Sequence, residues 1–405
     1  MTGARTRWVM VAMLGAATTV NYIDRQTLSI LSPLLRRELH LSEQDYSNIV
    51  TAFLISYTVM YAVGGRIMDA IGVRLGLTLS LAWWSVATML TGFARGAMSL
   101  GLFRFFLGAG EPCVFPAGVK VCGEWFPDRL RATATGIFSS GSAVGAILAP
   151  PVVAWITLQF GWRYAFVIPG ALGLLWLPVW WAVYRPAASR PGVTANPRSP
   201  NWSHLLRQRT VWGLVLSRFF SDPVWYFYLF WLPDYLQRER HLSLSEIGLY
   251  GWIPFLFADL GNVGGGLLSD FLVRRGVAPH RARMYVLGSV AVMAPLGALA
   301  GIAPSAATAI AVTCLVAFLT QCWSTNTAAL VTDLLPNSAN GSAMGLMGTA
   351  GSLAGACFAQ VLGFVIRNFG YPSAFGLAAI LHFFAAIILF WMLSPTFTPC
   401  RTRNN

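Results

Sequence analysis

Twelve long apolar runs constrain this chain more than any other feature of its sequence. Each run is long enough for a helix of ~20 residues, which spans the ~30 Å hydrocarbon core of a bilayer. The runs are too long for barrel strands and lack their alternating pattern, so helices are the only way to span a membrane. The sequence therefore predicts an all-α polytopic membrane protein. The runs lie at residues 9–35, 46–68, 76–94, 97–119, 132–157, 162–184, 210–233, 247–271, 282–303, 305–331, 340–366 and 371–394.

The composition supports this assignment. Hydrophobic residues make up 56% of the 405 residues and charged residues only 11%, whereas soluble domains carry about 25% charged residues. The net charge of +13 comes from basic residues scattered between apolar runs rather than clustered in a patch, which disfavours nucleic acid as a partner. We expect the lipid bilayer to surround the chain.

The distribution of basic residues predicts the orientation. The first run contains Asp24 and Arg25 and lacks a small-residue cleavage site, so it is no signal peptide. Of the 28 Lys and Arg residues, 18 lie on the side of the two termini, 7 on the other side and 3 inside runs. Because cytoplasmic loops collect positive charge, we expect both termini to be cytoplasmic. Near-exclusive use of Arg suggests a GC-rich bacterial genome. We expect the protein to lie in a bacterial inner membrane.

One stretch resembles a linker and divides the chain. Residues 185–209 are rich in Pro, Ser and Arg and contain no acidic residue. We interpret them as a cytoplasmic linker between an N-terminal six-helix bundle (1–184) and a C-terminal one (210–405). The alternative is a segment that binds lipid headgroups.

A short motif recurs half a chain length later. The stretch from Gly65 to Arg74 follows the second run, and a related stretch containing Asp270 and Arg274 follows the eighth. Asp69 and Asp270 are 201 positions apart, which indicates duplicated halves. Such an Asp can cap a neighbouring helix and pair with a loop Arg, which would hold a cytoplasmic gate shut. Two ordinary Gly/Arg turns are the alternative.

These motifs resemble the major facilitator superfamily. The Gly65–Arg74 stretch is similar to its signature loop, and three further stretches agree: Arg104 to Glu111, the glycines Gly136, Gly141 and Gly145, and Gly161-Trp162-Arg163. The resemblance implies twelve helices in two pseudo-symmetric six-helix bundles around a central cavity, working by alternating access. We expect a monomer.

Two narrower resemblances concern the substrate. The stretches Asn21–Arg25 and Glu124–Pro127 resemble the anion:cation symporters, and Ser217–Trp225 is most similar to their hexuronate transporters. This implies proton-driven uptake of a sugar acid such as glucuronate or galacturonate. Ser142 and Ser352 stand where some relatives have Gln and Asn, so the particular sugar stays open.

Seven ionisable residues are the clear cases of charges inside the membrane, where a charge costs ~2.5–3.5 kcal/mol at the bilayer centre. Each needs a partner, an aqueous cavity or a function. Arg104 and Glu111 are seven residues apart on one helix, about 10 Å along its axis, so Arg104 needs another partner, for which Asp24 is a candidate. Arg218 and Asp222 are four apart and could pair. The seven are Asp24, Arg25, Arg104, Glu111, Arg218, Asp222 and Asp259.

The chemistry of these groups suggests a transport site. Arginine presents a planar fork that matches a carboxylate, so Arg25 would bind the carboxylate of an organic anion. An apolar environment favours the neutral form of a carboxyl group, so Asp24 and Glu111 would load and release protons. The resemblance implies the same roles and adds Arg104 to the coupling network. The proton would be the coupling ion, and we expect no other cofactor and no metal.

Polar and aromatic residues at mid-membrane depth suit a hydroxylated ring. The candidates are Tyr22, Tyr57, Trp225, Gln321, Trp323 and Ser352. A proton-coupled exporter of drugs or metabolites on the same fold is the alternative function and would not need Arg25. The sequence lacks a Walker loop, a nucleophile elbow and metal-ligand spacing, so we expect no enzyme.

Overall fold

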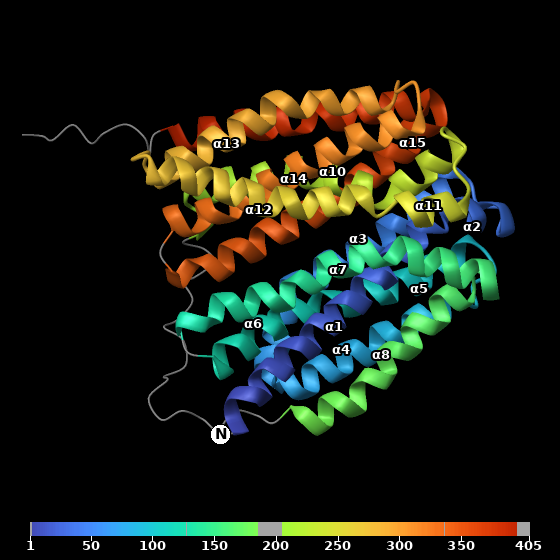
Figure 1. The fold of residues 1–405 in the computed structure, drawn as a ribbon, viewed down its shortest axis with the longest axis horizontal. Coiled ribbons are helices and arrows are strands. Elements are labelled where there is room, and N and C mark those ends of the chain that lie inside the picture. The colour runs from blue at the N-terminus through green and yellow to red at the C-terminus, as the bar shows by residue number, and fades with distance from the viewer. Residues whose placement is uncertain (1, 127, 185–204, 336, 395–405) are drawn as a thin grey trace, which may run out of the picture.

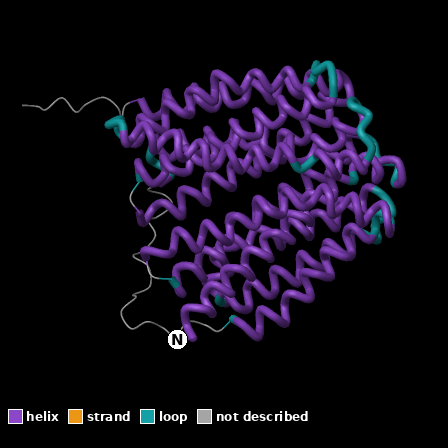
Figure 2. Tube along the Cα trace, viewed as in Figure 1, coloured by secondary structure: helices purple, strands orange, loops and turns teal. Residues whose placement is uncertain are grey.

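The computed structural model describes residues 2–126, 128–184, 205–335 and 337–394. Every regular element in these ranges is a helix (Figure 2). The predicted linker 185–209 lies mostly outside the described residues. The helices form two groups, one from residues before this segment and one from residues after it (Figure 1).

The first group runs from α1 to α8. Most of its boundaries lie within a few residues of the predicted runs, but the first run is divided by a turn at Leu31 and the fourth by a short 3-10 segment. The elements are α1 (Thr2–Ile30), α2 (Ser32–Glu38), α3 (Glu43–Ile71), α4 (Val73–Thr91), α5 (Ala97–Gly110), η1 (Glu111–Cys113), α6 (Val114–Trp125), α7 (Asp128–Phe160) and α8 (Tyr164–Val183).

The second group runs from α10 to α15. Its eighth and ninth predicted runs are each divided, and the last two are joined in α15 with a break at Gly370. The elements are α10 (Arg209–Arg238), α11 (Leu244–Tyr250), α12 (Ile253–Arg274), α13 (Pro279–Met293), η2 (Ala294–Ala300), α14 (Ala306–Leu334) and α15 (Asn337–Leu393).

Nine stretches of the described chain are long and apolar enough to cross a membrane. α1 and α10 are of similar length but are not among them, and both carry charged residues within the helix. The nine count residues 342–393 as one stretch of 52 residues. Gly370 has φ 75°, a left-handed conformation that glycine adopts without strain, so the chain turns there.

Two helices, α3 and α11, begin with side-chain caps. The Ser42 hydroxyl accepts from the backbone N–H of Asp45, whose carboxylate accepts from the Ser42 N–H at 2.9 Å. Ser243 and Glu246 repeat the arrangement at the start of α11. Such capping boxes satisfy orphan donors of the first turn, and they fix where α3 and α11 begin.

Close packing within the first group depends on two of the predicted glycines. A Cβ at Gly141 would lie 2.2 Å from the Gly15 carbonyl oxygen, and one at Gly145 would lie 2.5 Å from that of Thr19. α7 therefore packs backbone to backbone on α1. Gly136 has no such neighbour within 4 Å, so only part of the predicted glycine series has this role.

The two groups meet through a few helices. α3 packs against α15, and α1 packs against α10. The groups lie closest where α2, α3 and α11 gather and diverge toward the end that carries the N-terminus (Figure 1). Of the buried charges described next, Asp24 and Arg25 lie on α1, whereas Arg104 and Glu111 lie on α5 and η1.

Candidate functional site

Arg25 of α1 and Glu111 form a buried ion pair. Nε and Nη2 of Arg25 donate to the same Glu111 oxygen, Oε2, at 2.9 and 2.7 Å. Only 8% of the Arg25 side chain and none of the Glu111 side chain is exposed. Glu111 sits where α5 gives way to η1, directly before Pro112, which cannot continue the hydrogen-bond ladder of the helix. The other carboxylate oxygen, Oε1, has no hydrogen-bond partner among the described residues.

Three aromatic rings surround the Arg25 guanidinium. Its Cζ atom lies 4.7 Å from the ring centre of Tyr57, 5.0 Å from that of Tyr22 and 5.7 Å from that of Phe53. Rings hold a guanidinium through cation–π attraction without using its N–H donors. Arg25 thus keeps donors for a carboxylate, and the structure brings the predicted Tyr22 and Tyr57 together around it.

Asp24 lies on a different face of α1 and is fully buried. Neither of its carboxylate oxygens has a hydrogen-bond partner in the described residues. Arg104 was the expected partner, but its Nη1 donates to the backbone carbonyl of Asp24 at 3.2 Å instead. The Arg104 guanidinium also faces the Phe166 ring at 5.3 Å. The two charges are neighbours without a direct ion pair.

The second group contributes polar side chains from α10 and α14. Arg218 and Asp222 form the ion pair that their spacing predicted, with Arg218 Nε 3.1 Å from Asp222 Oδ1. Arg218 also donates from Nη1 to the Ser324 hydroxyl at 2.7 Å. Trp225, one turn further along α10, is half-buried against Phe255.

Trp323 and Ser352 were predicted to bind substrate, but their side chains contact other residues of the protein and not the Arg25 site. Trp323 is buried in the core of the second group, where its ring packs edge-on against His382 at 5.4 Å. It lies about 200° around α14 from the half-buried Gln321, so Gln321 and Ser324 share a face that Trp323 does not. Ser352 is buried and accepts from Thr58 at 2.9 Å, a contact between the two groups.

The predicted gate residues are only partly described. Gly65 and Asp69 lie in α3, and the surroundings of Gly65 and of the Asp69 side chain fall outside what the structure describes. Arg74 donates to the Trp181 carbonyl at 2.8 Å and stacks over the Trp181 ring. Asp270 of α12 pairs with Arg283 of α13 at 2.8 Å.

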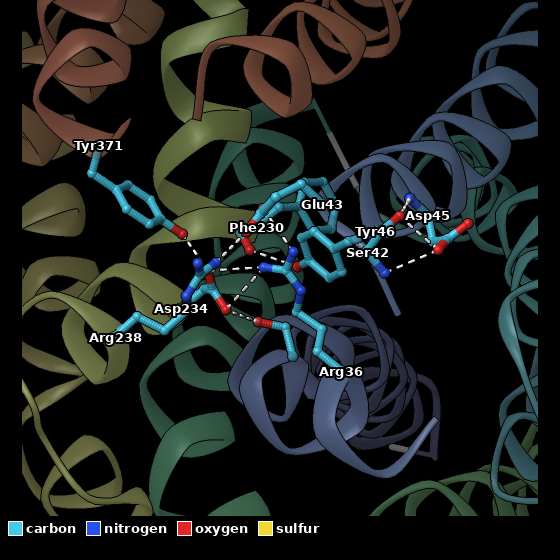
Figure 3. Close-up of polar contacts among 10 residues, drawn as sticks. Arg36, Ser42, Glu43, Asp45, Tyr46, Phe230, Asp234, Arg238 and Tyr371 are labelled. Carbon is cyan, nitrogen blue, oxygen red and sulfur yellow. Dashed lines mark hydrogen bonds and ion pairs between the residues drawn. The ribbon is translucent and has the colours of Figure 1, made fainter. Parts of the chain in front are cut away.

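A charge network at the opposite end was missed by the sequence analysis. Asp234 of α10 is fully buried and accepts from Arg36 of α2 at 3.3 Å, from Arg238 at 3.2 Å and from the Tyr371 hydroxyl (Figure 3). Glu43, the first residue of α3, pairs with Arg36 at 2.7 Å and also with Arg238. We call Arg36, Glu43, Asp234, Arg238 and Tyr371 the loop-end network.

This network joins the two groups. Arg36 and Glu43 come from the first group, and the other three residues come from the second. The Tyr46 hydroxyl adds a 2.6 Å bond to the Phe230 carbonyl across the same boundary. Asp234 directly follows Pro233 near the end of α10. An acidic residue at the end of an apolar run, with Arg36 and Arg238 in loops on the same side of the membrane, is the sequence signal that could have predicted the network.

The family of the chain follows from comparison with known proteins. The model of the Major Facilitator Superfamily matches residues 14–359. The chain therefore belongs to the Major Facilitator Superfamily.

Curated relatives extend over nearly the whole chain. The hexuronate transporter of Escherichia coli (strain K12) is 31% identical over 407 residues, covering 96% of this chain and 94% of that protein. The galacturonate transporter of Dickeya chrysanthemi is 31% identical, covering 71% and 90%. The hexuronate transporter of Bacillus subtilis (strain 168) is 28% identical, covering 95% and 94%.

Solved structures agree with the fold. A bacterial homolog of the human lysosomal transporter Spinster, in an inward-facing and unoccupied conformation, superposes with a TM-score of 0.81. It is 21% identical and covers 97% of this chain and 98% of that chain. At this identity the likeness concerns the fold alone.

Proposed function

We propose that this protein is a twelve-span importer of hexuronates, such as glucuronate and galacturonate, driven by the proton gradient across a bacterial inner membrane. The proposal rests on the buried Arg25. It pairs with the Glu111 carboxylate, and the rings of Tyr22, Phe53 and Tyr57 surround it. Relatives named as transporters of hexuronate and galacturonate support the substrate class. Support for twelve spans comes from adding α1 and α10 to the nine apolar stretches and counting the stretch broken at Gly370 as two.

The coupling follows from competition between two carboxylates. Arg25 is paired with Glu111 at 2.7 Å, and its planar fork matches a carboxylate on the substrate equally well. Protonation of Glu111 removes the charge that holds Arg25, so the substrate carboxylate takes its place. Release of the substrate restores the pair and expels the proton. One proton is then carried with each substrate molecule that binds Arg25 in place of Glu111.

Asp24 is a second proton carrier in this scheme. Its buried carboxylate has no hydrogen-bond partner among the described residues, and an unpartnered buried charge is unfavourable. Arg104 lies beside it and donates to its backbone carbonyl. Arg104 therefore joins the coupling network by compensating the negative charge of Asp24 and Glu111 without a hydrogen bond to either carboxylate.

The orientation and the conformation are part of the proposal. The 18 basic residues on the terminal side against 7 on the other favour cytoplasmic termini. The loop-end network then lies on the outer side and closes it, which corresponds to an inward-facing state. The Spinster homolog, solved inward-facing, has the same fold. In alternating access, the network opens when the cytoplasmic side closes. We propose that the monomer is the transport unit.

Labelled glucuronate uptake into proteoliposomes tests the proposal. With an inward proton gradient we expect accumulation by the wild type and none by Arg25→Ala. Arg207→Ala, which removes an arginine outside the site, is the control and should keep uptake. No uptake of several sugar acids by folded wild type would contradict the proposal and favour the exporter.

A further inference from the structure

A cavity of about 610 Å³ lies beside the loop-end network and has no part in the coupling scheme. One wall comes from α2 and the start of α3, and the other comes from the end of α10 and the residues that follow it. The cavity therefore lies across the boundary between the two groups. Small-molecule sites measure about 300–1,000 Å³, so a sugar acid fits. The charged residues that line the cavity are Arg36, Arg37, Glu43 and Arg238.

Positive charge exceeds negative charge around this cavity. Three arginines line it against one glutamate, and Asp234, which contacts Arg36 and Arg238 from the protein interior, adds a second carboxylate. Arg37 is exposed and makes no ion pair with any residue that the structure describes. Its Nε donates to the Pro33 carbonyl of its own helix at 3.4 Å, which leaves Nη1 and Nη2 available for a ligand.

Arg238 also has donors to spare. It contacts Glu43 and Asp234 through Nη1 alone (Figure 3), and 43% of its side chain is exposed. Its Nε and Nη2 make no hydrogen bond to any residue in the described part of the chain. A guanidinium presents its donors in a planar fork that matches a carboxylate. A carboxylate in the cavity is therefore offered donors by Arg37 of the first group and by Arg238 of the second.

The position of these arginines in the sequence also calls for an explanation. Only 7 of the 28 basic residues are expected on the side opposite the termini, and Arg36, Arg37 and Arg238 are three of those seven. Positive charge is scarce in loops on the non-cytoplasmic side of a membrane. Closing the loop end accounts for Arg36 and Arg238, which pair with Glu43 and Asp234. It does not account for Arg37.

An anion in this cavity bears on the closed loop end. Arg238 of the second group is paired with Glu43 of the first, so the carboxylate of a ligand competes with Glu43 for the same guanidinium. A ligand shifts a conformational equilibrium only as far as it binds one state better. Opening the loop end separates Arg238 from Glu43 and frees the guanidinium for the ligand. The bound anion therefore favours the open state.

We infer that this cavity is an outer anion site, in which Arg37 and Arg238 bind the carboxylate of the sugar acid before it reaches Arg25. This inference rests on the proposed function and extends it by a second binding site on the entry side. Positive charge at an entrance raises the rate at which an anion is captured, and salt weakens this effect.

Binding to the Arg25→Ala variant isolates the outer site. Labelled glucuronate is equilibrated with the full-length variant in an uncharged detergent at low and at high salt. We expect weak binding that high salt abolishes, because exposed charges are screened. Adding Arg37→Gln to this variant should weaken the binding at low salt by about 2- to 5-fold, the scale of one exposed charge pair.

Two matched variants show whether the charge of Arg37 is the cause. Arg25→Ala/Arg37→Lys keeps the charge and should bind glucuronate as Arg25→Ala does. Arg25→Ala/Arg95→Gln removes an exposed arginine that does not line the cavity and should also bind as Arg25→Ala does. Folded Arg25→Ala without salt-sensitive binding, or an equal loss with Arg95→Gln and Arg37→Gln, would overturn the inference.

Transport kinetics give an answer even if Arg25→Ala does not fold. In an otherwise wild-type chain, Arg37→Gln should raise the apparent KM for glucuronate uptake by about 2- to 5-fold and leave the maximal rate unchanged. An unchanged KM would contradict the inference. A lipid phosphate could occupy the same arginines, so uptake is measured in phosphatidylcholine with and without phosphatidylglycerol. An effect of Arg37→Gln that requires phosphatidylglycerol would assign the cavity to a lipid headgroup and overturn the inference.

The outcomes separate this inference from the proposed function. If the wild type transports glucuronate but neither binding nor KM depends on Arg37, only the inference fails. If folded wild type transports no sugar acid while Arg25→Ala binds glucuronate through Arg37, the outer site stands and the proposed function fails.

Discussion

Arg25 and Glu111 lie 86 positions apart in the chain and form a buried ion pair in which two guanidinium nitrogens contact one carboxylate oxygen. The second carboxylate oxygen has no partner among the described residues. A buried pair of this kind holds two charges that are each costly alone. Losing the charge of Glu111 therefore leaves Arg25 ready for another carboxylate, which is the basis of the coupling that we propose.

Glu111→Gln should separate exchange from accumulation. The amide cannot release a proton, so we expect substrate exchange across the membrane to persist while gradient-driven accumulation falls to the equilibrium level. Both rates are measured with labelled glucuronate in the same proteoliposomes. Glu239→Gln serves as the matched carboxylate control. Accumulation by Glu111→Gln equal to wild type would argue against this residue as a proton carrier.

Tyr57→Leu should weaken substrate binding more than Tyr57→Phe. The Tyr57 ring centre is 4.7 Å from the Arg25 Cζ atom, and a cation–π contact contributes about 0.5–2 kcal/mol. Because Tyr57→Phe keeps the ring, the apparent affinity of this variant for glucuronate should stay near that of the wild type. Leucine should lower the affinity by roughly 2- to 30-fold, the equivalent of that energy range. Equal effects of the two substitutions would rule out the ring contact as the cause.

Asp234→Asn should destabilise the closed loop end. The carboxylate is fully buried and accepts from Arg36, Arg238 and Tyr371, and removing one partner of a buried ion pair costs about 3–5 kcal/mol. We expect a lower melting temperature in detergent and a slower transport cycle, with Glu239→Gln unchanged.

The double variant Arg36→Gln/Asp234→Asn sharpens this test. Because the two residues contact each other at 3.3 Å, their effects on the free energy of unfolding should be less than additive. Strict additivity would mean that the loop-end network does not act as one unit.

Gly141→Ala should destabilise the first group of helices. The added Cβ would lie 2.2 Å from the Gly15 carbonyl oxygen, so α7 has to move away from α1. Overpacking of this kind costs about 1–3 kcal/mol. Gly136→Ala is the matched control, because nothing lies within 4 Å of its Cβ position. Thermal unfolding of the two variants gives the comparison, and equal melting temperatures would contradict the packing described for α1 and α7.

The helices were largely predictable from the sequence because long apolar runs have few alternatives in a membrane. The positive φ at Gly370 agrees with the break expected between the last two runs. The division of the fourth run at Glu111 was not predicted, although Pro112 marks it, because a membrane run can continue through proline.

The site was predictable only in part. Spacing correctly indicated the pair of Arg218 and Asp222, since residues four apart on a helix are neighbours. The partner of Arg25 and the position of Trp323 depend on how helices are rotated against each other, and residue types alone do not define that rotation. The loop-end network was missed because Arg36 and Arg238 look like ordinary loop charges until α2 and α10 are brought together.

Proton movement that depends on substrate tests the central claim most directly. Proteoliposomes containing a trapped pH-sensitive dye receive glucuronate on the outside, without a preset gradient and with the membrane potential clamped. We predict that the interior acidifies with the wild type and that Arg25→Ala abolishes the change. Glucuronate uptake by the wild type with no internal acidification would contradict the coupling of substrate and proton at Arg25 and Glu111.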